Sequence, residues 1–324
     1  MLGRIELCNL RLFRMITSSL LVLLLSYSLA NAEIAFEKIH ESPYHQLYSS
    51  RAANKSCLAL SSALEERITD LQITLGVYPQ NKVKIYIVHG EQDYNQISQG
   101  RNRIIEFSDA FYSGSEGVIY IRSQDQITEN YLHILIHEYI HWYLDQLFIS
   151  TPLWFHEGMA THFSGQMGYE RFLFYLKESL INPHSDLFRI GFRYPTDRQD
   201  WPRFYTSSAM AIRFMKEKHN QNWLRFWDIT AQSHREGHKI RFSQAFVSSY
   251  HQSLWDFQKR FEEYSKKQGY LYLAVAINSM IFALLPIVVI AIYIIKRKKR
   301  MQELPDLPEP AALVNDHSQT EEEE

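Results

Sequence analysis

The stretch His137-Glu138-Tyr139-Ile140-His141 lies within a strongly apolar part of the chain. On a helix, residues four apart share a face, so His137 and His141 can direct their imidazole nitrogens at one metal ion. Glu138 lies about 100° further around the helix axis, beside such an ion without being its ligand. From there its carboxylate can take a proton from a zinc-bound water, whose pKa the metal lowers to about 7.

A second segment, Pro152 to Ala160, strengthens this interpretation. The first motif alone would arise by chance in roughly a few per cent of chains with this many histidines. A catalytic zinc site needs three protein ligands and an open position, and two histidines with one carboxylate are a known set. Glu157 is the predicted third ligand, because a break at 150–152 is expected to turn the chain and bring a second helix beside the first. Gly158 is small enough to let those helices approach closely.

Several nearby residues offer alternatives. His133 lies four residues before His137 and is a rival metal ligand, although a surface or core role is favoured. Asp145 is a rival to Glu157 as third ligand. His156 and His162 flank Glu157, and they either support the metal site or simply pack.

The two segments together resemble the gluzincin branch of the MA clan of metallopeptidases, which includes thermolysin and the alanyl-type aminopeptidases. The resemblance implies one zinc ion per chain, bound by His137, His141 and Glu157, with Glu138 as general base. It also implies that the strand Gly117 to Ile121 is the sheet edge that aligns extended substrate. Tyr205 begins a segment similar to the helix on which relatives place an oxyanion-stabilising tyrosine.

The chain also departs from its apparent relatives. It lacks the Gly-x-Met-Glu-Asn sequence of the alanyl-type aminopeptidases, so exopeptidase activity does not follow. Thr161 stands where thermolysin-like enzymes have an aspartate that supports a zinc histidine. Leu144 and Leu147 occupy the later glycine and histidine positions of the metzincin pattern, which is therefore excluded.

Two apolar segments predict the topology. Residues 1–32 have a basic start, a short apolar middle and Ala30-Asn31-Ala32, which is typical of a cleaved signal peptide. Residues 271–295 are long enough for a transmembrane helix, and the basic cluster that follows favours the cytoplasmic side. Residues 33–268 are then the exported domain, and 296–324 form a cytoplasmic basic cluster with a disordered acidic tail. This arrangement suits a single-pass protein of a bacterial inner membrane with a periplasmic domain.

The remaining pattern predicts an α+β, zincin-like domain followed by the transmembrane helix. A helix is expected over 44–75 and strands over 83–88 and 117–121, while residues 89–114 show no clear pattern and the chain after Thr128 is mostly helical. A net charge of −2 gives no reason to expect nucleic-acid binding.

The predicted function is hydrolysis of a peptide or protein substrate outside the cytoplasm, with the bilayer as the partner of the C-terminal helix. One alternative is an inactive zincin-like scaffold, and another is a metal hydrolase of non-peptide amides or esters. Oligomeric state and side-chain preference stay open.

Overall fold

The computed structural model describes residues 34–51, 55–99, 108–127, 130–181 and 193–302. The chain forms a mixed α+β structure, as predicted. Its strands are β1 (Glu37–Glu41), β2 (His45–Ser49), β3 (Val83–Val88), β4 (Ala110–Ser113), β5 (Val118–Arg122), β6 (Phe148–Ile149) and β7 (Ile240–Arg241). Its α-helices are α2 (Lys55–Leu75), α3 (Glu91–Ser98), α5 (Tyr131–Leu147), α6 (Leu153–Phe163), α7 (Tyr169–Ile181), α8 (Trp201–Lys218), α9 (Asn220–Arg235), α10 (Phe242–Tyr250) and α11 (Leu254–Gln302).

The main sheet has five strands in the order β1-β2-β3-β5-β4. Strands β2, β3 and β5 are parallel, while β1 and β4 are antiparallel to their neighbours. In β3, the side chains of Val83, Ile85 and Ile87 lie on one face of the sheet and are buried in the hydrophobic core. On the other face Tyr86 stacks with Tyr120 at a centroid distance of 5.2 Å.

The edge of this sheet is not the predicted strand. Strand β5, which contains residues 118–121 of the predicted strand, lies inside the sheet, and β4 forms the edge beyond it. The reason is a tight turn, in which Gly117 has a φ of 69° and its N–H donates to the carbonyl of Ser113 at 2.7 Å. Glycine adopts this left-handed conformation at little cost, so the turn folds β4 back onto β5.

The predicted helix over 44–75 was wrong at its start. Residues His45–Ser49 form β2, and the helix α2 begins only at Lys55. Within β2, His45, Leu47 and Ser49 are buried in alternation, which is the period of a strand and not of a helix. Pairing with β3 decides this segment, and that pairing was invisible in its local pattern.

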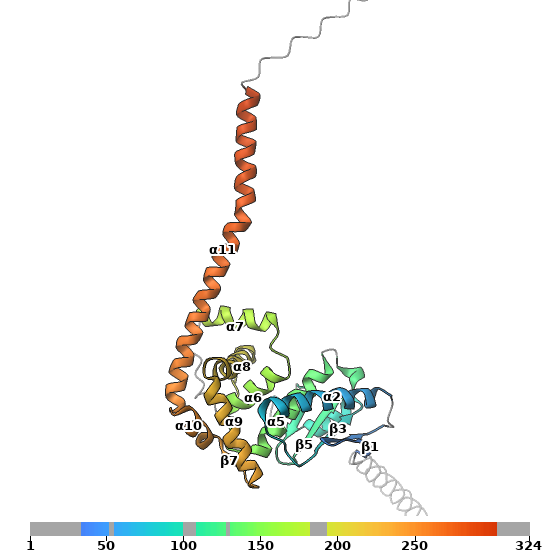
Figure 1. Cartoon of the computed structure of the whole chain (residues 1–324). Coiled ribbons are helices and arrows are strands. Elements are labelled where there is room, and N and C mark those ends of the chain that lie inside the picture. Colours follow the sequence, from blue (N-terminus) through green and yellow to red (C-terminus); the bar gives the residue numbers. More distant parts are fainter. Residues whose placement is uncertain (1–33, 52–54, 100–107, 128–129, 182–192, 303–324) are drawn as a thin grey trace, which may run out of the picture. The chain divides into compact units, whose positions relative to one another are not determined.

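Helix α5 connects the sheet to the helical part of the domain (Figure 1). It contacts β4 and β5 on one side and α6 on another. The helical part has an aromatic core, in which the ring centroids of Phe155 in α6 and Phe242 are 4.7 Å apart. Helix α6 in turn packs closely on α8, since a Cβ added at Gly158 would lie 2.5 Å from the carbonyl oxygen of Ser208. Gly158 thus permits the approach of α8, not that of α5 as the sequence suggested.

The chain divides into two compact units, residues 1–268 and 269–324. Helix α11 begins in the first unit, and its residues 269–302 belong to the second. Its apolar stretch has a mean hydropathy of 2.6, and its side chains are exposed, as in Phe282 at 72%. Of the helices in the described ranges, α11 alone has the length and apolar composition to cross a bilayer. The predicted signal peptide and acidic tail lie outside the described residues, whereas 296–300 continue the helix.

Candidate metal centre

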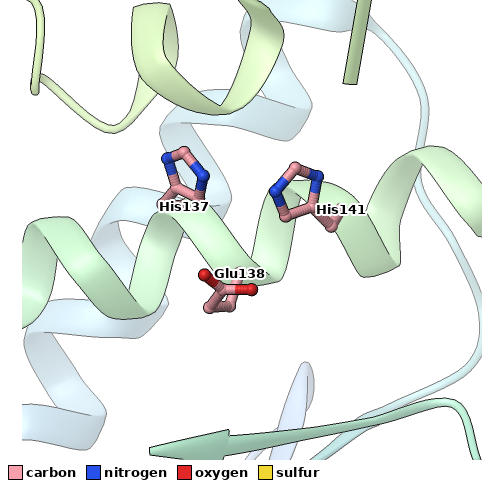
Figure 2. A group of neighbouring side chains, drawn as sticks. All are labelled: His137, Glu138 and His141. Atoms are coloured by element: carbon pink, nitrogen blue, oxygen red, sulfur yellow. The ribbon is translucent and has the colours of Figure 1, made fainter. Parts of the chain in front are cut away.

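The two histidines of the HEYIH motif lie on one face of α5, as predicted. Their side chains are 12% and 14% exposed, and the opposite face of the helix is buried in the core. The side chain of Asn130 caps the helix by accepting from the backbone N–H of His133. Figure 2 shows the rings of His137 and His141 on successive turns of α5 and Glu138 on the neighbouring face.

Glu157 reaches the same place from α6. The chain leaves α5 after Leu147, passes Ser150 with a φ of 57°, and enters α6 at Leu153, so the predicted break at 150–152 is confirmed. Oε2 of Glu157 lies 3.3 Å from Nε2 of His137, and its Oε1 lies 3.7 Å from Nε2 of His141. The structure therefore brings the three predicted ligands together.

The spacing and chemistry of these atoms fit a zinc ion. Ligand atoms around a tetrahedral ion with bonds of about 2.1 Å lie roughly 3.4 Å apart, close to both separations. Oε2 of Glu157 is also a buried acceptor without a hydrogen-bond donor among the described residues. A buried oxygen of this kind costs free energy unless a donor or a cation compensates it. A cation between the two helices would satisfy the carboxylate and both imidazoles.

Glu138 is held beside this ligand set. One ligand atom each of His137, Glu138 and His141 lie within 4.8 Å of one another, so these three side chains could also hold a metal ion. Oε2 of Glu138 accepts a hydrogen bond of 2.8 Å from the backbone N–H of Tyr112 in β4. Glu138 thus lies close to the site and is oriented by the sheet edge.

The surroundings shift the pKa values of the two glutamates in opposite directions. Burial raises the pKa of Glu138 to about 7, and the negative charge of Glu157 adds to this. Burial would also raise the pKa of Glu157, but the positive charge of the histidines and the hydroxyl of Tyr194 hold it at about 2. Glu157 therefore stays ionised while Glu138 can exchange a proton near neutral pH.

The two histidines also differ. Burial lowers the pKa of His141 to about 3, so this imidazole is neutral and has one ring nitrogen with a free lone pair. Burial acts in the same direction on His137, but contact with Glu157 and its charge outweigh it and raise that pKa. A bound divalent cation would compete with a proton for these nitrogens.

Two tyrosines complete the site. Tyr205, at the start of α8, lines the same cavity, as the resemblance implied. Burial and the charges of Glu157 and Glu138 raise its pKa, so its hydroxyl remains a hydrogen-bond donor. Tyr194 was missed, although its hydroxyl donates to Oε1 of Glu157. Its neighbours carry no motif, and with 20 tyrosines in the chain nothing local distinguished it.

Of the alternatives named from the sequence, His133 and His162 lie outside the cavity lining, whereas Asp145 and His156 belong to it. His133 points toward Gly165, where its Nε2 would be 3.4 Å from an added Cβ. His162 packs its ring on Phe163 at a centroid distance of 4.8 Å. Asp145 and His156 line the cavity but contact each other, with Oδ1 of Asp145 3.6 Å from Nε2 of His156.

The cavity over these residues has a volume of about 530 Å³. Strand β4 forms one wall through Ala110, Phe111 and Tyr112, and α6 supplies Leu153. Arg171 of α7 brings a permanent positive charge to the lining. The site is therefore a recess large enough for a few side chains, bounded on one side by a sheet edge.

No model of a known protein family matches the chain, and no curated protein matches it significantly.

Proposed function

We propose that this protein is a membrane-anchored zinc peptidase of the gluzincin type, with a zincin-like exported domain. One observation carries the proposal. Glu157 meets both histidines of the HEYIH motif at 3.3 and 3.7 Å, while Glu138 of the same motif is held apart by the N–H of Tyr112. This arrangement supports a site with three ligands and one base.

The residues have separate roles in the proposed reaction. Zinc held by His137, His141 and Glu157 would supply Lewis acidity and lower the pKa of water. Glu138 takes a proton from the attacking water and passes it to the leaving amine, a task suited to a carboxyl with a pKa near 7. Tyr205 donates a hydrogen bond to the oxyanion that develops on the substrate carbonyl.

The proposed location follows from α11 and the basic residues after its apolar stretch. We infer a single-pass inner-membrane protein with residues 33–268 outside the cytoplasm, because Lys and Arg clusters are retained on the cytoplasmic side. A reporter fused after Arg300 should behave as cytoplasmic and one fused near Lys267 as exported. An exported reporter after Arg300 would contradict this orientation.

The test of function compares the full-length protein with its Glu138→Gln variant on a diverse peptide library. Glutamine keeps the shape of glutamate but is not a proton acceptor. We expect zinc content to be retained and cleavage to fall by roughly 100-fold to 10,000-fold or more. The exposed Glu66→Gln on α2 is the matched control and should cleave like the wild type.

Other outcomes favour the alternatives. Equal cleavage by both proteins would contradict the mechanism. Absence of cleavage, with a cellular phenotype that survives Glu138→Gln, would favour the scaffold. Hydrolysis of amide or ester probes without any peptide cleavage would favour a non-peptide substrate.

A further inference from the structure

His141 has a second nitrogen, and its partner lies on the helix that carries Glu157. Nδ1 of His141 lies 3.4 Å from Nδ1 of His156, within hydrogen-bond distance. Nε2 of His156 then faces Oδ1 of Asp145 at 3.6 Å. The three side chains form a row that leads away from the candidate metal centre, and those of the two histidines are mostly buried, at 14% and 17% exposed.

Two carboxylates act on the protons of this row in opposite directions. A carboxylate oxygen only accepts hydrogen bonds, so Asp145 favours a proton on Nε2 of His156, and Nδ1 of His156 can then accept from Nδ1–H of His141. Glu157, whose Oε1 lies 3.7 Å from Nε2 of His141, favours the proton of His141 on Nε2 instead. The His156–Asp145 pair and Glu157 therefore compete for the tautomer of His141.

When the proton of His141 is on Nδ1, Nε2 of His141 and Oε1 of Glu157 face each other as two electron-rich atoms without a proton between them. This arrangement is unfavourable alone and becomes favourable when a cation lies between them. In metal sites a ligating histidine commonly has its other ring N–H bound to an outer acceptor that orients it. Thr161, which stands where the resemblance would place a supporting aspartate, has a buried hydroxyl without a hydrogen-bond partner among the described residues.

We propose that His156, backed by Asp145, is a positioning residue that holds His141 in its Nδ1–H tautomer and thereby prepares Nε2 for zinc. This inference rests on the proposed zinc site and adds the residues that support it. It assigns to the His156–Asp145 pair the supporting role that an aspartate at position 161 would otherwise fill.

The first test needs no metal. Nitrogen-15 NMR of histidine-labelled, zinc-free, full-length protein in detergent reports the tautomer of each ring, and the His141→Gln and His156→Asn spectra assign the two signals. We expect a larger fraction of His141 rings with the proton on Nδ1 in the wild type than in His156→Phe, where Glu157 is unopposed. An equal fraction in both proteins would overturn the proposal whatever the protein catalyses.

The second test measures the zinc dissociation constant by chelator competition. His156→Phe removes the acceptor and should weaken zinc binding by about 10-fold to 100-fold. His156→Asn, whose side-chain oxygen can still accept from His141, should recover part of the affinity and also serves if the Phe variant fails to fold. His162→Phe changes the other histidine of α6, outside the cavity lining, and should bind like the wild type.

Asp145 acts through His156 in this scheme, so Asp145→Asn should weaken zinc less, and the double variant should bind no more weakly than His156→Phe alone. Additive losses would show independent roles, and a loss in His156→Phe below roughly threefold would overturn the proposal. If zinc affinity depends on His156 but no peptide is cut, the peptidase proposal fails and the positioning role stands. If peptides are cut and His156→Phe binds zinc as tightly as the wild type, the reverse holds.

Discussion

The backbone N–H of Tyr112 donates a hydrogen bond to Oε2 of Glu138 at 2.8 Å, which joins the edge strand β4 to the carboxylate beside the candidate metal centre. A peptide that lies along β4 would therefore pass next to the proposed base. The bond also favours the ionised carboxylate, against the stronger effect of burial.

The choice of third ligand can be tested by exchange of one carboxylate at a time. Glu157→Gln removes the charge that faces both histidines, and zinc affinity should fall by more than the roughly 100-fold typical of changes outside the ligand shell. Asp145→Asn should still hold one zinc per chain at saturating zinc. Metal analysis after gel filtration measures both. Full zinc occupancy in Glu157→Gln, together with loss in Asp145→Asn, would make Asp145 the ligand.

Substitution of Tyr205 and of Tyr194 by phenylalanine should have different effects. Tyr205→Phe removes a donor to the developing oxyanion, so kcat should fall by about 100-fold to 1,000-fold with zinc affinity unchanged. Tyr194→Phe removes the hydrogen bond to Glu157 and should chiefly weaken zinc, by about 10-fold to 100-fold. Steady-state kinetics at saturating zinc and chelator competition separate the two effects. A kcat loss confined to Tyr194→Phe would exchange their roles.

Gly158→Ala should destabilise the folded domain that contains α6 and α8. The new Cβ would lie 2.5 Å from the Ser208 carbonyl oxygen, so α6 and α8 must separate, and overpacking of this kind typically costs about 1–3 kcal/mol. The change should appear as a lower Tm in a thermal melt of the full-length protein. Gly168→Ala is the matched control, since no atom lies within 4 Å of its added Cβ. Equal Tm values for the two variants would contradict the close helix contact.

Stability should decrease in acid partly because of His45. Its ring is fully buried between the hydroxyls of Ser42 and Ser61, at 2.9 and 3.0 Å, and burial, aided by the charge of His40, lowers its pKa to about 4. The unfolded chain binds a proton at His45 near pH 6.5 and the folded chain only near pH 4. The contribution of His45 to the free energy of unfolding is thus full above pH 6.5 and declines by up to about 1.4 kcal/mol per pH unit as the pH falls toward 4.

His45→Gln should make the Tm less dependent on pH between 6.5 and 4, whatever its effect at pH 7. The control is His238→Gln, because the side chain of His238 is 60% exposed. Thermal melts at several pH values measure the slopes. A slope in His45→Gln equal to that of the wild type would show that another group causes the acid sensitivity.

The sequence by itself determined the features that depend on neighbours along the chain. The pairing of His137 with His141 follows from the helical repeat, and the apolar stretch of α11 follows from composition. The strand Val83–Val88 and the helix break at 150–152 were also read correctly, since side-chain alternation and a nearby proline are local signals. Zinc chemistry and the chain break pointed to Glu157, and the resemblance supplied Tyr205; both line the same cavity.

Only the tertiary structure decided which distant residues meet. Residues His45–Ser49 became a strand because β3 was available to pair with them, and β4 became the sheet edge because of the turn at Gly117. Tyr194 on Glu157 and His156 between His141 and Asp145 have no sequence signature of their own. Contacts of this kind require atoms on different elements to lie within a few ångströms of each other. The packing of α5, α6 and β4 sets these separations, and the local sequence pattern does not encode them.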